Sequence, residues 1–392
     1  MQSFDTIVLG LGAMGSAALY HLARRGARVL GIDRFAPPHA LGSSHGDTRI
    51  TRLAIGEGER YTPLVLRSHE LWRELEAETG AELLVACGGL VLSSGSATSH
   101  THVANFFDNT LAAARRFGIA HELLDAVEIR RRFPQFRVAD GERGYLERDA
   151  GFLRPEQCIA AHLLAARRRG ATLRCDERAS AFHASSGGVS VTTDRGTYSG
   201  ANLIVAAGAW LPGLAGPDIA RHFTVYRQTL LWFAIEGDAK PFAVDRCPVF
   251  IWELTGRPQS IYGFPAVDGP PGGVKIASER FDRPTDPDAV DRDVSGDEIA
   301  ALHRDYVAPY VAGVGRRCLK ASTCLYTVTP DFGFVLDRHP AAEGVLLASP
   351  CSGHGFKHSP AIGEALAAMA CGASARFDLA PFRLRRFGAT RV

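Results

Sequence analysis

The sequence predicts an α/β protein of two domains, and three observations support this prediction. The chain has 392 residues, more than one ordinary hydrophobic core holds. Residues 4–9, 13–25 and 27–32 read as strand, helix and strand, with a glycine-rich turn after the first strand, which is a βαβ start. Residues 203–207 form another short apolar strand that ends in glycine. The first domain is therefore expected to be discontinuous, with the chain leaving it and returning.

Glycines and an acid occupy informative positions in the N-terminal βαβ pattern. Gly10 allows the tight turn, Gly12 lets the backbone approach a pyrophosphate, and Gly15 lets the helix pack closely on the strand. The helix N-terminus offers free N–H groups to an anion, and Asp33 can accept a hydrogen bond from a ribose hydroxyl. The pattern predicts a bound dinucleotide and does not separate NAD from FAD.

The overall composition excludes several classes of partner. The net charge is +2, and no long basic run alternates with aromatic residues, so nucleic acid is not expected as a partner. No apolar run is long enough to span a bilayer, and the N-terminus lacks the layout of a signal peptide. Eight cysteines are scattered without the spacing of a metal site or a disulfide framework. We therefore expect a cytoplasmic protein that holds no metal.

Residues 42–52 combine small side chains with mixed charge, which predicts a loop. This segment contains His45 and two arginines, Arg49 and Arg52. Two interpretations stay open. The arginines can form a solvated face, or one of them can face a cleft and bind a carboxylate through two hydrogen bonds.

The middle of the chain predicts helices and then a sheet rich in aromatic residues. The helical segments are 62–79, 105–117, 126–133, 155–169 and 299–306. Residues 188–198 read as a hairpin that turns at 194–196. Three further strands, at 223–234, 249–254 and 260–264, suggest an antiparallel sheet. Its aromatic side chains either line a substrate pocket or belong to the core, and they are Trp232, Phe233, Trp252 and Tyr262. Lys275 follows on another strand, where a lysine is ordinarily a surface residue.

The C-terminal third predicts a strand at 344–348, a loop at 351–358 and a helix from 359 to about 370. Ser359 suits the N-cap and Pro360 the first helical position. His354 and Lys357 lie just before this helix, whose N-terminus would stabilise negative charge on a bound group. Both residues are therefore candidate site residues.

Several motifs, in order along nearly the whole chain, resemble the family of monomeric sarcosine oxidase and N-methyltryptophan oxidase. The motifs are the glycine turn at 10–15, His45-Gly46-Asp47-Thr48-Arg49 with Arg52, Gly56-Glu57-Gly58 with Tyr61, Tyr262-Gly263-Phe264-Pro265 with Lys275, Cys324-Leu325-Tyr326-Thr327, and Ser352-Gly353-His354-Gly355-Phe356-Lys357. The tail at 377–384 also looks like family sequence.

The resemblance implies FAD bound through a thioether between its 8α-methyl group and Cys324. It implies that Arg52 and Lys357 hold the substrate carboxylate, that Arg49 and His45 lie beside the flavin, and that Lys275 assists the reaction with O2. Tyr262 and Tyr326 would line the substrate pocket. Two cations on one carboxylate would orient the C–H bond of the amine, and a cation beside the ring would stabilise the charge that develops on O2. The cofactor-binding residues are expected to be Gly10, Gly12, Gly15, Asp33, Cys324, Gly353, His354, Gly355 and Lys357.

One position departs from the family pattern. The family usually has histidine four residues after the oxygen-activating lysine, and this chain has Glu279. Glu279 either brings negative charge to the pocket and favours a substrate with a second cationic group, or it points to solvent. Cys318 is a second cysteine near the attachment position, but it lacks the surrounding motif.

The predicted fold is α/β, with a Rossmann-like FAD-binding domain of the glutathione-reductase type and a mostly antiparallel α+β substrate domain. Residues 1–85, 150–215 and 318–392 are assigned to the first domain, and 86–149 and 216–317 to the second. The expected activity is oxidation of a secondary amino acid to an imine by a monomeric enzyme, with O2 reduced to H2O2. The alternatives are an oxidase of cyclic or primary amines, an NAD-dependent dehydrogenase, and a flavoprotein that binds its ligand without turnover.

Overall fold

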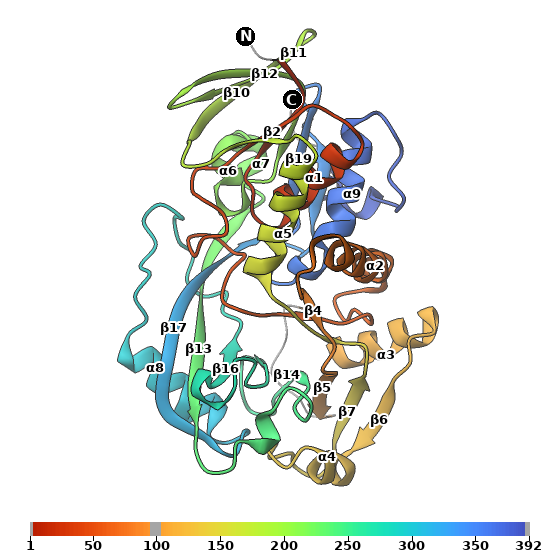
Figure 1. The fold of residues 1–392 in the computed structure, drawn as a ribbon. Coiled ribbons are helices and arrows are strands. Elements are labelled where there is room, and N and C mark those ends of the chain that lie inside the picture. Colours follow the sequence, from red (N-terminus) through yellow and green to blue (C-terminus); the bar gives the residue numbers. More distant parts are fainter. Residues whose placement is uncertain (1–2, 95–102, 389–392) are drawn as a thin grey trace.

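The computed structural model describes residues 3–94 and 103–388. Figure 1 shows two bodies: an upper one that contains β1, α1, α5 and α9, and a lower one built around the long strands β13 and β17. The mixed α/β architecture agrees with the predicted fold class. The exact domain borders stay a prediction.

The upper sheet, as far as the chain is described, has eight strands in the order β10-β11-β12-β1-β2-β9, with β19 beside β12 and β18 beside β19. β1 is parallel to both β2 and β12, and β12 is parallel to β19. The bounds are β1 Ser3–Leu9, β2 Val29–Ile32, β9 Thr172–Arg174, β10 Ala179–Ser185, β11 Gly188–Thr193, β12 Gly196–Val205, β18 Val335–Arg338 and β19 Val345–Ser349. The parallel centre is the expected βαβ arrangement.

One long strand replaces two predicted segments in this sheet. The hairpin at 188–198 and the strand at 203–207 were expected to be separate, but β12 runs without a break from Gly196 to Val205. Its first half pairs antiparallel with β11, and its second half joins the parallel core beside β1. The hydrophobic pattern of the sequence differs between the two halves of β12 because only the second half is buried on both faces.

Helices cover the upper sheet (Figure 1). They are α1 Ala13–Arg24, α2 Thr62–Thr79, α5 Pro155–Arg168 and α9 Ser359–Ala370, with the short α6 Leu211–Leu214 and α7 Pro217–Ala220 nearby. α1 packs on both α5 and α9. Gly363 allows α9 to approach α1 closely, since a Cβ at this position would lie 2.6 Å from the backbone of Ala17. Helices from both ends of the chain therefore share one core.

The lower sheet, over the described residues, has the order β17-β13-β16-β15-β14-β5-β7-β6. All pairs are antiparallel except β14 with β5. The bounds are β5 Gly89–Ser94, β6 Glu122–Asp125, β7 Glu142–Glu147, β13 Thr224–Ile235, β14 Val249–Trp252, β15 Ile261–Gly263, β16 Val274–Ser278 and β17 Val314–Val328. The helices of this body are α3 Phe106–Phe117, α4 Ala126–Arg132 and α8 Gly296–Leu302. The sheet is mostly antiparallel, as predicted.

A small sheet corrects the prediction that residues 42–52 are all loop. β3 (Arg49–Thr51) pairs antiparallel with β8 (Gly151–Leu153), which also pairs with β4 (Leu84–Val85). The strand is only three residues long and its partner lies about a hundred residues away, so local composition could not reveal it. The pairing gives Arg49 and Arg52 a fixed place instead of a solvated loop.

The structure selects the core alternative for three of the four aromatic candidates and differs from expectation at Lys275 and at the N-cap of α9. Trp232, Phe233 and Trp252 are buried core residues and do not line the main cavity, so of the four aromatic candidates only Tyr262 does. Lys275 is not on the surface but is 2% exposed. The N-cap of α9 is His358, not Ser359, because a 3-10 turn at Phe356–His358 runs directly into the helix.

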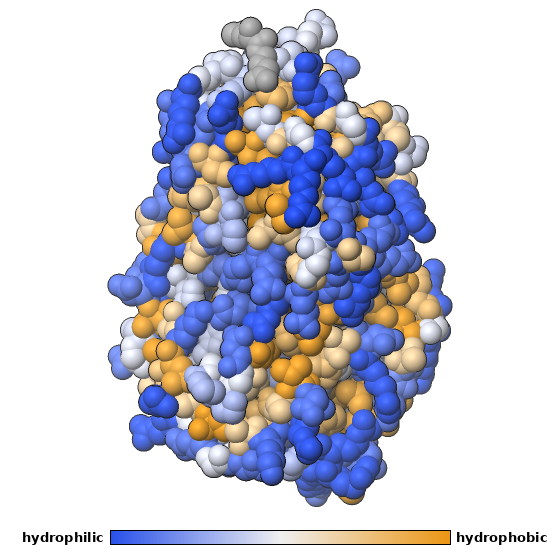
Figure 2. All heavy atoms as spheres, in the orientation of Figure 1, coloured by the Kyte–Doolittle hydropathy of each residue, from blue (hydrophilic) through white to orange (hydrophobic). Residues whose placement is uncertain are grey.

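The face of the molecule that Figure 2 shows is mostly polar. Figure 2 shows hydrophilic side chains over most of one face, with apolar residues in separate patches between them. Among the described residues, the helices are too short or too polar to cross a membrane.

Candidate active site

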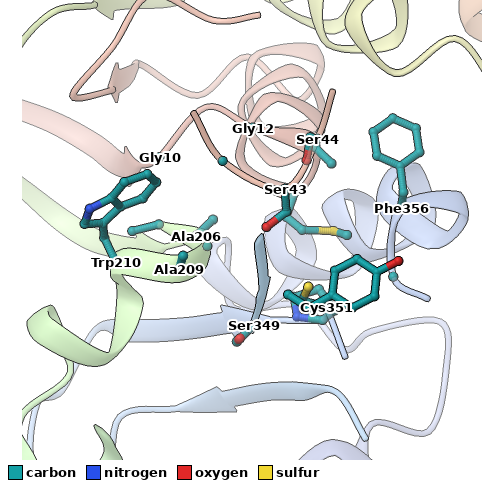
Figure 3. Close-up of a pocket in the computed structure, with 18 of the residues that line it drawn as sticks. Gly10, Gly12, Ser43, Ser44, Ala206, Ala209, Trp210, Ser349, Cys351 and Phe356 are labelled. Atoms are coloured by element: carbon teal, nitrogen blue, oxygen red, sulfur yellow. The ribbon is translucent and has the colours of Figure 1, made fainter. Parts of the chain in front are cut away.

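One cavity of about 640 Å³ connects the glycine turn of the upper body with the aromatic strands of the lower body. Figure 3 shows its walls, where Gly10 and Gly12 face Trp210 at one side and Cys351 and Phe356 at the other. The size lies within the range of small-molecule and cofactor sites. The predicted site residues that line it are Gly10, Gly12, Asp33, Arg49, Arg52, Tyr262, Glu279, Tyr326, Gly353, His354, Gly355 and Lys357.

The glycine turn leaves open space where a phosphate group would lie. Gly10 has φ of +85°, and a Cβ there would lie 2.5 Å from the carbonyl oxygen of Ala206 at the end of β12. A Cβ on Gly15 would lie 1.7 Å from the carbonyl oxygen of Gly10. A Cβ on Gly12 would lie 3.8 Å from its nearest neighbour, the Ser44 hydroxyl oxygen. α1 follows Gly12 directly and has no side-chain cap. The first N–H groups of α1 are thus available to an anion.

Asp33 ties the end of β2 to the glycine turn. One carboxylate oxygen accepts a hydrogen bond from the Leu11 N–H at 2.6 Å, and the other accepts one from the Phe35 N–H at 2.9 Å. Burial raises the pKa of this carboxyl, and the two backbone hydrogen bonds oppose that shift. A carboxylate has about four acceptor sites, so Asp33 retains capacity for a hydroxyl group in the cavity.

The loop after β19 approaches the same cavity from the C-terminal side. Gly353 has φ of +84°, and a Cβ there would lie 3.0 Å from the Tyr326 ring and 3.1 Å from a carboxylate oxygen of Glu279. A Cβ on Gly355 would lie 1.6 Å from the Pro350 carbonyl oxygen. Glycine is therefore required at both positions for the loop to follow this path. His354 is held in the loop by a 3.1 Å hydrogen bond between its Nε2 and the Phe332 carbonyl oxygen.

Two buried cations and one buried carboxylate meet at the cavity wall. Arg52, 4% exposed, donates from Nη2 to Glu57 Oε2 at 2.6 Å and from Nη1 to the Ala54 carbonyl at 2.8 Å. Its buried Nε has no hydrogen-bond partner. Lys357, 5% exposed, donates to the His354 carbonyl at 2.7 Å and lies 3.9 Å from Glu57. Arg52, Lys357 and Glu57 together carry one net positive charge, which suits one carboxylate.

The charge of Lys357 is sensitive to its surroundings. Burial lowers the pKa of Lys357 to about 8; Glu57 opposes this shift, whereas Arg52 adds to it. Lys357 is therefore mostly protonated at neutral pH and loses its charge in moderately alkaline solution. Glu57 was not among the predicted site residues. The signal that could have suggested it is the Gly56-Glu57-Gly58 motif, which belongs to the family resemblance.

Lys275 lies behind the cavity wall and not on it. Its ammonium group donates to the Gly46 carbonyl at 2.7 Å, to the Thr48 carbonyl at 3.0 Å and to the Thr48 hydroxyl at 3.2 Å. Burial lowers the pKa of Lys275 well below its usual range, and the Arg49 charge lowers it further. Thr48 was not among the predicted site residues, because its role depends on a partner more than two hundred positions away.

Arg49 connects the 42–52 segment to β17. It donates to the Thr48 carbonyl at 2.8 Å and to the Ser43 carbonyl at 2.8 Å, and its Nη2 lies 3.5 Å from the Cys324 sulfur. His45 is buried nearby with its Nε2 unpartnered. Burial lowers the pKa of His45 to about 3, and the Arg49 charge contributes to that shift. His45 is therefore neutral at physiological pH.

Three cysteines stand at different distances from the cavity. Cys324 is fully buried on β17, 3.4 Å from the Ser43 carbonyl oxygen, and its backbone lies next to Tyr326 on the wall. Cys351 lines the cavity directly and was not predicted (Figure 3). Neither Cys324 nor Cys318 lines the cavity itself, but Cys324 contacts Ser43 and Arg49, which do, whereas Cys318 is partly exposed and donates to the Lys320 carbonyl. The geometry disfavours Cys318 as an attachment residue.

Tyr262 and Tyr326 form an apolar wall with polar tips. Burial raises the pKa of Tyr262 to about 12 and raises the pKa of Tyr326 well above its usual range, so both phenols stay neutral. Glu279 lines the cavity next to them. Its carboxylate contributes to both upward shifts.

Comparison with known proteins decides the family. The model of the family described as FAD dependent oxidoreductase matches residues 5–369. This chain belongs to that family. It is 41% identical to monomeric sarcosine oxidase of Streptomyces avermitilis over 99% of this chain and 98% of the relative. It is also 36% identical to N-methyl-L-tryptophan oxidase of Salmonella heidelberg, over 98% of this chain and 100% of the relative. The predicted resemblance is confirmed, and the chain is an FAD-dependent oxidoreductase.

Solved structures agree with this FAD-dependent family. NikD, an unusual amino acid oxidase essential for nikkomycin biosynthesis, has a TM-score of 0.84 at 27% identity and covers 98% of each chain. Glycine oxidase from Geobacillus kaustophilus, at 22% identity and a TM-score of 0.76 over 98% of this chain and 99% of the other, shares the fold. The match to the family model confirms the expectation of FAD, which the glycine pattern alone left open between NAD and FAD.

The residues present fit FAD. The open space at Gly12, the uncapped start of α1 and the carboxylate of Asp33 suit a pyrophosphate and a ribose. The same cavity continues to the loop after β19 and the tyrosine wall, so one elongated cofactor can reach from the glycine turn to Cys351. Among the residues that the structure describes, His, Cys, Asp and Glu side chains form no cluster suited to a metal ion.

Proposed function

We propose that this oxidoreductase oxidises a secondary amino acid, such as sarcosine or a larger N-methyl amino acid. The carbon next to the substrate nitrogen loses a hydride and the nitrogen loses a proton, so the C–N bond becomes the double bond of an imine, which water hydrolyses to an aldehyde and an amine. FAD, when bound, supplies the two-electron acceptor, and O2 takes up these electrons with two protons as H2O2. The relatives named for sarcosine and N-methyl-L-tryptophan support this substrate class.

The observation that carries the proposal is the pair of buried cations at the cavity wall. Arg52 offers an unpartnered Nε, and the Lys357 ammonium has donors left beyond its bond to the His354 carbonyl. A substrate carboxylate between them would accept hydrogen bonds from both groups. Since two contacts fix the carboxylate, they also fix the direction of the amine and its C–H bond.

The same charges favour the reactive form of the amine. An ammonium group near two cations and out of water loses stability relative to the neutral amine. Only the neutral amine can release a hydride, because its nitrogen lone pair must stabilise the forming imine. Tyr262 and Tyr326 keep their protons at neutral pH and can orient this lone pair or the leaving proton. These four residues would therefore bind and orient the substrate.

Lys275, Arg49 and His45 would serve the oxygen side of the site. Arg49 supplies positive charge within a few ångströms of the 46–48 segment, Lys275 adds to it when protonated, and neutral His45 adds none. Preorganised positive charge stabilises the negative charge that develops as O2 is reduced. The cofactor is proposed to be joined to Cys324 by a thioether, supported by its burial beside Ser43 and Arg49.

Glu279 is proposed to influence which substrate is preferred. It adds a carboxylate to the cavity wall beside the tyrosines. A substrate with a second cationic group, or a cyclic amine such as proline or pipecolate, is the alternative within the oxidase class. The NAD-dependent alternative is set aside because the chain belongs to an FAD-dependent family.

The test is H2O2 release from a panel of paired primary and N-methyl amino acids, with proline and pipecolate included. We expect activity with N-methyl or cyclic members and little with their primary partners. Activity confined to primary amino acids would contradict the proposal. Anaerobic bleaching of the flavin by the best substrate would exclude a protein that binds its ligand without turnover. The domain borders, a monomeric state and a cytoplasmic location are also proposed and await separate measurement.

A further inference from the structure

A tryptophan lies between two lysines in register across three strands. Trp232 on β13 pairs with Lys275 on β16 and with Lys320 on β17. The Lys275 ammonium lies 5.2 Å from the indole centroid, and the Lys320 ammonium lies 4.6 Å from it. Both distances are in the range of cation–π attraction. Lys275 is buried, whereas the Lys320 side chain is half exposed, so the indole connects an inner charge with a surface charge.

The surface lysine also binds the segment that holds the inner lysine. Lys320 Nζ lies 2.7 Å and 2.9 Å from the two carboxylate oxygens of Asp47. Asp47 stands between Gly46 and Thr48, whose carbonyl groups accept hydrogen bonds from Lys275. One residue therefore contacts Lys320 through its side chain while its two neighbours contact Lys275 through the backbone.

The backbone at Asp47 is strained. Its φ is +67°, and the Thr48 N–H donates to the Gly46 carbonyl at 2.7 Å. A three-residue turn with this bond and a positive φ is rare and costs energy for a residue other than glycine. Glu156 stabilises the turn from the opposite side, where one carboxylate oxygen accepts from the N–H groups of Gly46 at 2.6 Å and Asp47 at 3.2 Å. A strained turn persists only where its surroundings hold it.

We propose that Asp47, Lys320 and Trp232 are positioning residues that hold Lys275 in place for the reaction with O2. The Lys320–Asp47 pair fixes the turn, the turn points two carbonyl groups at the Lys275 ammonium, and Trp232 supports that ammonium from the side. This inference rests on the proposed role of Lys275 in the oxygen reaction. It predicts that surface substitutions affect a buried step without touching substrate binding.

The charges around Lys275 give each variant a different effect. The charged and titratable groups that act on Lys275 are Arg49, Asp47, Cys324, Glu156 and His45. The Asp47 charge raises the pKa of Lys275, so Asp47→Asn should lower it. Lys320 partly neutralises the Asp47 charge, so Lys320→Met should raise the pKa of Lys275. Opposite shifts would show that both residues act on Lys275 through charge, and the reoxidation rates test the positioning role.

The experiment separates the two half-reactions by stopped flow on the holoenzyme. Anaerobic reduction by the best amine is measured first, and reoxidation of the reduced enzyme by O2 is then followed across pH. Because a displacement of about 1 Å at an active site costs up to about 10²-fold in rate, we expect reoxidation to slow about tenfold in Asp47→Asn and Lys320→Met. The rate at which the amine reduces the flavin should stay within about twofold of the wild type, since neither Asp47 nor Lys320 lines the cavity and no displacement of the substrate is expected.

Controls keep the outcomes distinct. Lys240→Met removes a different exposed lysine and should leave both half-reactions unchanged. Lys320→Arg keeps the positive charge that Lys320→Met removes, so it should be reoxidised at about the rate of the wild type. If Lys275→Met slows reoxidation but Asp47→Asn and Lys320→Met do not, the positioning role is refuted while the role of Lys275 stands. If Lys275→Met leaves reoxidation unchanged, the proposed role of Lys275 fails and this inference fails with it.

Discussion

Lys357 offers the most direct test of how the site recognises its substrate. The perturbation is Lys357→Met, which shortens the side chain by one atom and removes its charge. The substitution deletes one charge-assisted hydrogen bond to a bound carboxylate, worth about 1.5–3 kcal/mol. At 1.36 kcal/mol for each tenfold change, affinity should fall about 10- to 150-fold. Arg52 remains, so binding weakens without being abolished.

The pH dependence gives the same test in the wild-type protein. The pKa of Lys357 is lowered to about 8, chiefly by burial. Lys357 is charged below this pH and neutral above it, so the affinity for a carboxylate should be constant at lower pH and decrease as pH rises through about 8. Lys357→Met should show weak binding throughout and lack this change. Lys357→Arg should keep binding at high pH, because the guanidinium stays charged.

The assay uses acetate, which carries the carboxylate without an amine and so avoids the titration of the substrate. Its dissociation constant is measured from the perturbation of the flavin absorbance between pH 6.5 and pH 10. The spectrum of each variant before titration checks that the fold and the cofactor are intact. Equal affinity in the wild type and Lys357→Met, or wild-type affinity that does not change with pH, would refute the reasoning.

Three further substitutions test other parts of the site. Cys324→Ser should release the flavin when the protein is denatured with acid, and yellow colour that stays with the denatured chain would rule out this attachment. Gly10→Ala should lower the share of purified chains that carry FAD, because its Cβ would lie 2.5 Å from the Ala206 carbonyl oxygen and disturb the turn to which FAD must bind before attachment. Gly26→Ala is the matched control, with a similar positive φ and nothing within 4 Å, and should cost only about 1–2 kcal/mol of stability. Glu279→Gln should lower kcat/KM for dibasic N-methyl amino acids more than for sarcosine, and an equal change for both would remove Glu279 from specificity.

Local sequence was sufficient for the features that depend on close neighbours. The βαβ start, the glycine turn and the helix at 62–79 matched the structure because turn chemistry and apolar periodicity are local signals. The motifs around Arg52, Tyr262, Tyr326 and Lys357 also pointed to the cavity walls, since recognition of a family uses many positions at once. Their individual roles stay predictions.

Tertiary structure decided the features that depend on distant partners. β3 forms only because β8 supplies its hydrogen bonds, and β12 is one strand because half of it is buried on both faces. The burial of Lys275 depends on acceptors at Gly46 and Thr48, which no local pattern links to a strand in the lower sheet. Such contacts bring together residues that lie far apart in the chain.

The sequence by itself therefore determined the fold class, the cofactor-binding turn and the family, because each rests on local chemistry or on many matched positions. Only the tertiary structure placed Glu57 between Arg52 and Lys357 and joined Lys320 to the turn at Asp47. The charge of a buried group depends on its desolvation and on neighbours within a few ångströms. Those neighbours are set by folding and not by sequence distance.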